Sequence, residues 1–563
     1  MKLALVPINV KVGDFEENLK KILTQIEIAV KQGASLVVFP ELSLIGYPAQ
    51  DLLLRPTFAK KCAEQLDALH EAVKKYPKLA VVVGTALELP QESSNPTRKL
   101  LVNCAVFLQG ERKEIRIKTL IPFYDIFYES RYFESAIAFD NKYRSPILMD
   151  DGTRLGILIC EDSWHNMKLH GQQIHTANPT KYLIEQGVDF CINISASPYN
   201  LKKRELRRET IALAAKEYKT SIFYVNHFGA QDEILFDGDA FACAANGNIV
   251  SAKEDFNGEI LLLESALSEE KKSRKLTDQN MRDLHSALVC GIRDYAKKNN
   301  FQKFVLGVSG GIDSALVATL ACDAVGPENV LGLVMPSKFS SVASIEDAEL
   351  LAANLGMKLK NFPIKFLHST FNLALKPFFE GKKEDITEEN LQSRLRGVGI
   401  MAFSNKFNYL PLATGNKSEF AMGYTTLYGD MCGALAPIGD LYKTEIYALA
   451  HFLNQGKIRI PERTITKAPS AELRANQTDQ DTLPPYELLD AILLELIEKE
   501  LEPKEAKKSL EERFPKLSIS EIEKIQKQIQ ISEYKRRQAP PILRVSLKAF
   551  GMGRLYPITA VVQ

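Results

Sequence analysis

No two cysteines in the sequence have the CxxC spacing of zinc sites and thioredoxin-like redox centres. The eight cysteines are instead scattered singly, as Cys62, Cys104, Cys160, Cys191, Cys243, Cys290, Cys322 and Cys432. This spacing gives little support to a zinc site or a disulfide-exchange centre. Scattered cysteines are typical of a reducing compartment, so we expect a cytoplasmic protein.

An excess of charge of one sign is also missing, because 71 Lys and Arg residues are balanced by 70 Asp and Glu residues. The chain therefore has no overall field to attract nucleic acid or an anionic membrane, and neither is an expected partner. No uninterrupted apolar run approaches the roughly 18 residues of a membrane span. The opening MKLALVPINV is broken by Pro7 and Asn9 and predicts a buried strand rather than a signal peptide. Small molecules are the expected substrates.

The length of 563 residues is too great for one hydrophobic core, so we expect at least two domains. Residues 1–262 alternate β-rich apolar runs with amphipathic helical patterns, which predicts a sheet-rich α/β domain. Residues 263–278 are polar without an apolar period and predict a partly helical linker. A second α/β domain is expected over residues 279–563. Asn246-Gly247-Asn248 and Asn257-Gly258 predict hairpins near the end of the first domain.

The predicted strands are short apolar runs bounded by turn residues. They are Leu36–Phe39, Ala80–Gly84, Leu155–Ile159, Phe190–Ile194 and Ile222–Val225 in the first domain, and Phe304–Val308, Val330–Met335 and Tyr409–Ala413 in the second.

Three segments of the first domain place a reactive side chain where a predicted strand ends, a usual place for catalytic groups in α/β folds. FPELSLIGYP contains Glu41, IRIKTLIPFYDIFYESRYF contains Lys118, and LGILICEDSW contains Cys160. Taken singly, the cysteine is expected to be a small buried apolar residue, the glutamate a cap or surface charge, and the lysine a solvated charge. Together they supply a thiol nucleophile, a base for its proton and a cation for an oxyanion, which predicts acyl transfer.

These segments, in this order, resemble the nitrilase/amidase superfamily and specifically its glutaminase branch, over the whole first domain. The resemblance implies an αββα sandwich. It implies that Cys160 is the nucleophile, Glu41 the general base and Lys118 the oxyanion stabiliser. Glu129 is implied to help hold the substrate amide.

Glutamine recognition in that branch involves a tyrosine after the catalytic lysine and the segment SASPYNLKKRE. The matching positions are Tyr124, Ser197 and Lys203, although Lys203 is also readable as one of many solvated charges at a helix start. Phe123-Tyr124-Asp125 stands where the branch often has Asn-Tyr-Gly, so the pocket differs in detail.

In the second domain, FVLGVSGGIDSALVATL places a glycine-rich loop between an apolar strand and a helix. Glycines allow backbone N–H groups to approach phosphate, and a helix N-terminus favours an anion. The expected ATP-binding residues of this loop are Gly307, Val308, Ser309, Gly310, Gly311, Ile312, Asp313 and Ser314. Asp313 can face phosphate only with a cation between them, which indicates Mg²⁺. No GK[ST] follows, so the loop is not a Walker A motif; a plain Gly-Gly turn capped by Asp and Ser is the alternative.

The SGGIDS run resembles the loop of the N-type ATP pyrophosphatases, which adenylate an acid that ammonia then attacks. LATGNKSEFAMGYTTLYGDMCGALAPIGDLYKTEIY, APSAELRANQTDQDTLPPYELLD and EYKRRQAPPILRVS resemble the NAD synthetase family across residues 280–563. The implied fold is Rossmann-like and doubly wound. PSKFSSVASIEDA resembles the family's mobile loop on the ATP side, with Ser337, Lys338, Ser340 and Ser341 as its first polar residues.

The resemblance also assigns roles outside the phosphate loop. It implies that Thr414 and Lys443 contact ATP, that Asp313 and Glu419 bind Mg²⁺, and that Asn390, Glu419 and Lys535 contact deamido-NAD. Without the motif context, Lys443 and Lys535 are ordinary surface lysines.

The two resemblances together imply a glutamine-hydrolysing NAD synthetase, with ATP as co-substrate and a homo-oligomeric, often octameric, assembly. Three rivals are another ammonia-using synthetase, a tRNA-modifying enzyme and a catalytically dead scaffold. The nitrilase-like half argues against the first, and the balanced charge argues against the second. The intact Glu41, Lys118, Cys160 and Asp313 argue against the third.

Overall fold

The computed structural model describes residues 1–88, 99, 101–169, 171–253, 256–267 and 279–560. It divides into two compact units, Met1–Thr277 and Asp278–Gln563. Residues 268–278 of the predicted linker lie outside the described residues. Within the described part of the chain, no helix is long and apolar enough to cross a membrane.

The first unit contains two six-stranded sheets. The strands of the first sheet, in spatial order, are β16 (Leu261–Glu264), β1 (Lys2–Leu5), β2 (Leu36–Val38), β3 (Ala80–Glu88), β4 (Leu101–Gln109) and β5 (Arg112–Ile117). Those of the second are β15 (Ile249–Lys253), β14 (Ala240–Cys243), β11 (Ser221–Asn226), β10 (Phe190–Ser195), β7 (Arg154–Ile159) and β6 (Ile147–Leu148). Two hairpins accompany them, β8 (Lys168–Leu169) with β9 (Gln172–Gln173), and β12 (Phe228–Gln231) with β13 (Ile234–Asp237).

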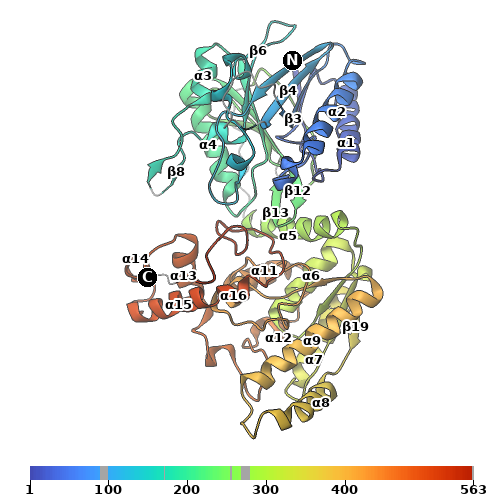
Figure 1. Ribbon diagram of the computed structural model, residues 1–563, viewed down its shortest axis with the longest axis vertical. Helices are drawn as coiled ribbons and strands as arrows, with labels where there is room; N and C mark the ends of the chain where they lie inside the picture. The colour runs from blue at the N-terminus through green and yellow to red at the C-terminus, as the bar shows by residue number, and fades with distance from the viewer. Residues whose placement is uncertain (89–98, 100, 170, 254–255, 268–278, 561–563) are drawn as a thin grey trace. The chain divides into compact units, whose positions relative to one another are not determined.

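The inner faces of the two sheets share one apolar core, to which strands of both sheets contribute. Helices α1 (Phe15–Lys31) and α2 (Pro56–Val73) lie on the outer side of the first sheet, and α3 (Pro179–Glu185) and α4 (Lys203–Tyr218) lie on that of the second (Figure 1). Helices α1 and α2 each bury an apolar stripe against the sheet, which is the behaviour expected of an amphipathic surface helix. Helix α4 differs, because it also buries two arginines, Arg204 and Arg207. The unit is therefore the αββα sandwich that the resemblance implied.

Of the two hairpins predicted in this unit, the structure contains one. Asn246-Gly247-Asn248 joins the antiparallel strands β14 and β15, so that prediction is confirmed. The prediction at Asn257-Gly258 is wrong, because β15 belongs to the second sheet and β16 pairs with β1 in the first. A local turn signal shows that the chain bends, whereas the partner of the following strand is set by contacts distant in sequence.

The second unit is built on a parallel sheet in the order β19-β18-β17-β20. These strands are β17 (Phe304–Gly307), β18 (Val330–Val334), β19 (Lys358–Asn361) and β20 (Leu410–Leu412). Counted along the chain, the order is third, second, first and fourth, which is the Rossmann-like, doubly wound arrangement that the resemblance implied. The strand order reverses between β17 and β20, and ligands of such sheets bind at that point.

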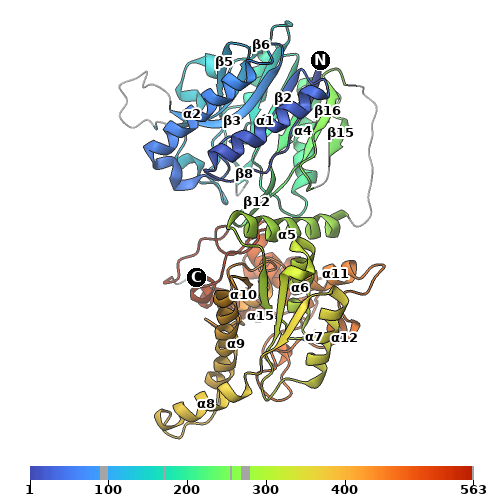
Figure 2. The same ribbon diagram turned by 90° about the vertical axis from the view of Figure 1, so that its right-hand side faces the viewer.

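Helices cover both faces of this sheet (Figure 2). Side chains of β17 and β18 pack with Ile400 of α9 (Ile386–Phe407) on one face. Helices α6 (Ile312–Val325) and α7 (Val342–Leu355) contact the strands on the other. The remaining helices are α5 (Gln279–Lys298), α8 (Lys365–Leu375), α10 (Lys417–Met422), α11 (Lys443–Leu453), α12 (Glu462–Thr466), α13 (Tyr486–Leu493), α14 (Pro503–Leu510), α15 (Ile519–Ile531) and α16 (Glu533–Arg536).

Candidate active sites

A buried cluster of charges joins three of the predicted residues of the first unit. The Lys118 ammonium lies 2.7 Å from Glu41 Oε1 and 2.8 Å from Glu129 Oε2, and all three side chains are at most 5% exposed. Asn103 of β4 donates to the same two oxygens, at 2.7 and 3.3 Å. Burial alone would lower the pKa of Lys118, but the charges of Glu129 and Glu41 outweigh it and raise that pKa well above its ordinary value. The lysine therefore stays a cation in the interior.

Both carboxylates of this cluster are held by further contacts. The second oxygen of Glu41 accepts from the Ala196 N–H at 2.8 Å, and the Tyr47 hydroxyl donates to Glu129 at 3.2 Å. Burial raises the pKa of Glu129 to about 7, with Lys118 opposing and Glu41 adding to the shift. A Cβ at Gly84 of β3 would lie 2.3 Å from the backbone nitrogen of Leu42. Only glycine therefore fits beneath the segment that contains Glu41.

Cys160 is the first residue of a short 3-10 helix, Cys160–Ser163, that directly follows β7. Its φ of +45° is unusual for a residue with a side chain, and its side chain is buried. Asp162 fixes this turn by accepting from the N–H groups of Ile159, Thr119 and Leu120, at 2.8–3.0 Å. The short helix that contains Cys160 is thereby bound to the segment that follows Lys118.

Burial raises the pKa of the Cys160 thiol well above its ordinary value; the charge of Glu41 adds to this shift and that of Lys118 opposes it. We expected Lys118 to favour the thiolate, and its effect has that direction but is outweighed. The resting group is therefore a thiol, and a base would have to take its proton before it could act as a nucleophile.

Besides Glu129, the residues predicted to bind glutamine lie in the loop after β5, in the loop after β10 and at the start of α4. The Tyr124 hydroxyl donates to the Glu161 carboxylate at 3.0 Å, and the Lys203 ammonium lies 4.1 Å from the centre of the Trp164 ring. The Ser197 N–H donates to Asn226 at 2.8 Å. All are half-buried or buried.

The departure from the family pattern after Tyr124 has a backbone explanation. Asp125 has a φ of +56°, in the left-handed region that favours glycine, and the branch often has glycine there. Aspartate is one of the few other residues that adopts this conformation readily. The backbone at this position therefore suits glycine as well as aspartate.

A fully buried arginine supports the Ser197 segment. Arg207 of α4 lies 2.9 Å from Asp237 and 3.1 Å from Asp239, and its guanidinium also donates to Ser197 Oγ at 3.4 Å. Burial would raise the pKa of Asp237, but the charges of Arg207 and Arg204 lower it to about 2. Since this pKa is below the unfolded value, the pair stabilises the fold above about pH 4 and loses that effect as the pH falls towards 2.

Arg207→Met is expected to lower the free energy of unfolding at pH 7 by about 3 kcal/mol, because two buried carboxylates lose their shared cation. The difference from wild type should narrow as the pH falls towards 2, because only the wild type then loses the stabilisation of this ion pair. Denaturant titrations at several pH values measure both effects. Arg208→Met is the matched control, since Arg208 is partly exposed and bonds Asp239 alone among these two carboxylates. Equal losses in the two variants would contradict this account.

The glycine-rich loop of the second unit joins β17 to α6 at the point where the strand order reverses. The Ser309 and Ser314 hydroxyls lie 3.1 Å apart, and the Gly311 N–H donates to Ser309 Oγ at 3.2 Å. Gly310 has a φ of +80°, and a Cβ there would lie 2.2 Å from the Ser344 carbonyl oxygen. Glycine is therefore required at this position by both conformation and space.

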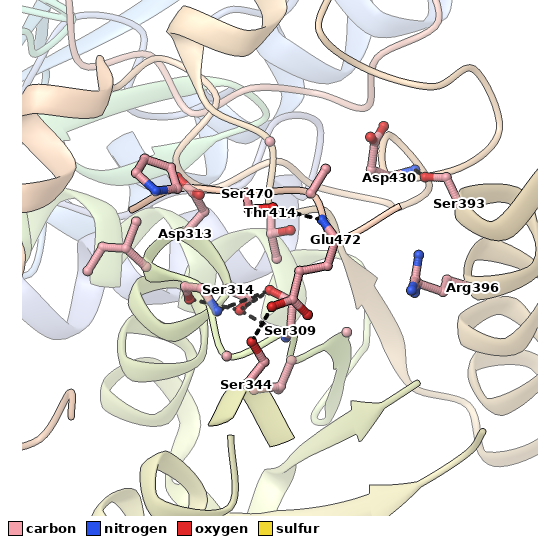
Figure 3. Close-up of a pocket in the computed structure, with 18 of the residues that line it drawn as sticks. Ser309, Asp313, Ser314, Ser344, Ser393, Arg396, Thr414, Asp430, Ser470 and Glu472 are labelled. Carbon is pink, nitrogen blue, oxygen red and sulfur yellow. Dashed lines mark hydrogen bonds between the residues drawn. The ribbon is translucent and has the colours of Figure 1, made fainter. Parts of the chain in front are cut away.

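A cavity of about 260 Å³ opens above this loop (Figure 3). Its lining includes every loop residue predicted to bind ATP, together with Thr414, Glu419 and Lys443. The other two predicted residues, Asn390 and Lys535, contact the segment from Gly423 to Thr426. Asn390 accepts from the Thr426 hydroxyl at 2.7 Å, and Lys535 donates to the carbonyl oxygens of Gly423 and Thr425 at 2.7 and 2.8 Å.

Asp313 and Glu419 both face one cation, the ammonium of Lys443. Their oxygens lie 2.6 and 3.2 Å from Lys443 Nζ. Asn416 holds Asp313 from the other side by donating to it at 2.9 Å. Burial raises the pKa of Glu419 to about 8, with the charge of Lys443 opposing and that of Asp313 adding to the shift. Two carboxylates directed at one point form a donor set that fits Mg²⁺.

Sequence reasoning missed a second polar cluster in this cavity. Glu472 accepts from Ser344 Oγ at 2.7 Å (Figure 3). It also accepts from Ser341 Oγ at 3.0 Å and from Lys467 Nζ at 2.8 Å. These contacts join residues 467–473 to Ser341 and Ser344, which lie within the segment that resembles the family's mobile loop. The second part of that segment is helical and forms the start of α7. Arg396 of α9 also lines the cavity. The sequence motifs that contain Ser341, Ser344 and Glu472 were recognised. Their spacing gave no sign that Glu472 bonds the two serines.

The comparisons with known proteins cover both units. A family model described as NAD synthase matches residues 284–539, and one described as carbon-nitrogen hydrolase matches residues 2–275. The glutamine-dependent NAD(+) synthetase of Synechocystis sp. is 43% identical over 560 residues, covering 99% of this chain and 98% of the relative. That of Thermotoga maritima is 37% identical over 597 residues, with coverages of 99% and 98%.

Solved structures agree with these relatives. The glutamine-dependent NAD+ synthetase of Acinetobacter baumannii, solved in complex with ADP, is 33% identical with a TM-score of 0.73, covering 99% of this chain and 98% of that one. The enzyme of Cytophaga hutchinsonii is 20% identical with a TM-score of 0.81, covering 100% and 98%, which shows the shared fold. The chain belongs to the family of glutamine-dependent NAD(+) synthetases.

Proposed function

We propose that the protein converts deamido-NAD, ATP and glutamine into NAD, AMP, pyrophosphate and glutamate. The observation that supports this most is that one chain contains both parts of the chemistry. The first unit has the buried Glu41–Lys118–Glu129 cluster beside a cysteine, and the second has an SGGIDS loop over a cavity. Relatives that match over 98% of their own length are named glutamine-dependent NAD(+) synthetases.

In the first unit, Cys160 attacks the side-chain amide carbon of glutamine while Glu41 takes the thiol proton. The Lys118 ammonium stabilises the oxyanion, and its two buried carboxylate partners hold it in place. Ammonia leaves with the proton returned by the base, and a thioester remains on Cys160. Water then hydrolyses the thioester to glutamate, with the same base accepting a proton from water.

In the second unit, the loop from Gly307 to Ser314 and the N-terminus of α6 bind the ATP phosphates. Asp313 and Glu419 would hold Mg²⁺, which neutralises phosphate charge when bound. Lys443 supplies a further cation next to them. Asn390 and Lys535 would hold deamido-NAD beside the segment from Gly423 to Thr426. The nicotinate carboxylate is adenylated, and ammonia displaces AMP.

The proposal also includes the oligomeric state of the protein and its location in the cell. Helix α8 and the residues after it expose several large apolar side chains, namely Phe366, Leu367, Phe371, Leu373 and Phe378. An exposed apolar patch of this kind favours a homo-oligomer, for which an octamer is the form that the resemblance implied. Analytical sedimentation measures the mass of the assembly and thus its number of subunits. All eight cysteines are unpaired, which fits a cytoplasmic protein.

The function is tested by supplying glutamine labelled with ¹⁵N in its side-chain amide, together with ATP, Mg²⁺ and deamido-NAD. We expect NAD with one labelled nitrogen, and one AMP and one pyrophosphate for each NAD formed. Reactions with GMP precursors, with aspartate or with tRNA in place of deamido-NAD examine the rival synthetases. Formation of ADP and phosphate, or turnover only with another acceptor, would contradict the proposal.

A further inference from the structure

A buried cation of the second unit has no part in the reaction proposed above. Lys417 is the first residue of α10, and its side chain is fully buried. Its ammonium lies 2.8 Å from Asp440 Oδ1, contacts the carboxylate of Glu498 and donates to Ser546 Oγ at 2.7 Å. The other Asp440 oxygen accepts from the N–H groups of Val545 and Ser546, at 2.8 and 2.7 Å. Three segments that are distant in sequence therefore meet at this one ammonium.

The position of Lys417 on α10 relates it to the proposed Mg²⁺ ligand Glu419. Helix α10 spans only six residues, and a helix this short has little stability of its own, so its contacts set its direction. Residues two positions apart are separated by about 200° around a helix and point to nearly opposite sides. Glu419 accordingly lines the cavity, whereas Lys417 points into the interior. A rotation of α10 that moved Glu419 would pull Lys417 away from its two carboxylates.

Two ion pairs join α10 to the segment that leads into α11. On the cavity side, Lys443 of α11 lies 3.2 Å from Glu419 of α10. On the far side, Lys417 of α10 lies 2.8 Å from Asp440, which is three residues before Lys443. Mg²⁺ held by Asp313 and Glu419 would repel the Lys443 ammonium from its position between them, because like charges disfavour each other at one site. The pair on the cavity side would then open, and the pair on the far side would still hold the two segments together.

We infer that Lys417 is a positioning residue, which keeps Glu419 directed at the proposed Mg²⁺ site while Lys443 moves away from it. The two carboxylates that hold its ammonium take part in this role. The inference rests on the proposed function, since it concerns the Mg²⁺ that accompanies ATP. Lys417 also donates its backbone N–H to the Leu441 carbonyl at 2.9 Å, so the two segments stay in contact when only the ammonium is removed. Loss of the ammonium should therefore weaken metal binding in the folded protein and not only lower its stability.

The experiment uses two variants of the full-length protein. Lys417→Met removes the ammonium, and Glu498→Gln removes one of its two charged partners while keeping the size of that side chain. NAD synthesis from ammonium salt is measured over a range of Mg²⁺ concentrations at saturating ATP. Lys417→Met should raise the Mg²⁺ concentration for half-maximal synthesis by about 10-fold, the effect expected when a group that orients a metal ligand is lost. Its kcat at saturating Mg²⁺ should change much less. Glu498→Gln should shift the Mg²⁺ dependence in the same direction by a smaller factor.

A second measurement needs no turnover. Thermal unfolding is followed with ATP and Mg²⁺, and again with ATP and EDTA, and the difference in Tm measures the stabilisation that requires the metal. This difference should be smaller in both variants than in the wild type. Each variant is compared with itself, so a general loss of stability is subtracted. If Lys417→Met does not fold, Glu498→Gln alone decides.

Arg459→Met is the matched control, because it breaks a half-buried ion pair with Asp323 in the same unit, and neither residue lines the cavity. It should lower Tm and leave the Mg²⁺ dependence unchanged. Folded Lys417 and Glu498 variants with the wild-type Mg²⁺ dependence would overturn the inference, and so would an equal shift in Arg459→Met or a wild type that needs no Mg²⁺. A wild type that forms no NAD from ammonium, ATP and deamido-NAD would instead refute the proposed function.

Discussion

Cys160→Ala is expected to lower glutamine-driven NAD synthesis by about 10⁴-fold or more, while synthesis from ammonium salt is nearly unchanged. The reason is that no thioester forms without the sulfur, whereas the cavity of the second unit contains none of the groups of the first. Glu41, Lys118 and Glu129 would remain in place, since their contacts do not involve the thiol. Initial rates of NAD formation with each nitrogen source measure the effect.

The control for this prediction is another buried cysteine of the same unit. Cys62 of α2 is fully buried, and burial raises its pKa to about 12. Unlike Cys160, it does not belong to the predicted catalytic group. Cys62→Ala should cost stability but keep glutamine turnover. If Cys160→Ala still hydrolyses glutamine near the wild-type rate, Cys160 is not the nucleophile.

Asp313→Asn is expected to lower NAD synthesis by about 10³-fold from glutamine and from ammonium salt alike. Asparagine keeps the size of the side chain but removes the charge that faces Lys443 at 2.6 Å. The proposed Mg²⁺ site then loses one of its two carboxylates, and Lys443 loses the closer of its two carboxylate contacts. Pyrophosphate release with ammonium as the nitrogen source isolates this step from glutamine hydrolysis.

Asp323→Asn is the matched control on the same helix, α6. Its carboxylate bonds Arg459 and His285 near the far end of that helix and does not line the cavity. We expect this variant to keep its activity at the cost of some stability. Full activity of Asp313→Asn with ammonium, or equal losses in both variants, would refute the role of the loop.

The sequence by itself determined which local segments carry the chemistry. A strand, a glycine-rich loop and a helix follow one another between Phe304 and Val325, and this order can be read directly because all its signals are local. The same holds for Cys160 directly after β7 and Lys118 directly after β5. Strand ends were predicted to within a few residues, since apolar runs and turn residues mark them.

Only the tertiary structure decided which of these segments meet. Lys443 and Asp313 are 130 positions apart, and Lys118 and Glu41 are 77 apart, yet each pair is within 2.7 Å. Strand order sets such contacts, and no local pattern shows strand order, which is also why the turn at Asn257-Gly258 was assigned to the wrong partner. Glu161 is the sharpest case: its place beside Cys160 was visible in the sequence, but its burial and its contacts with Tyr124 and His175 exist only once the sheets are packed together.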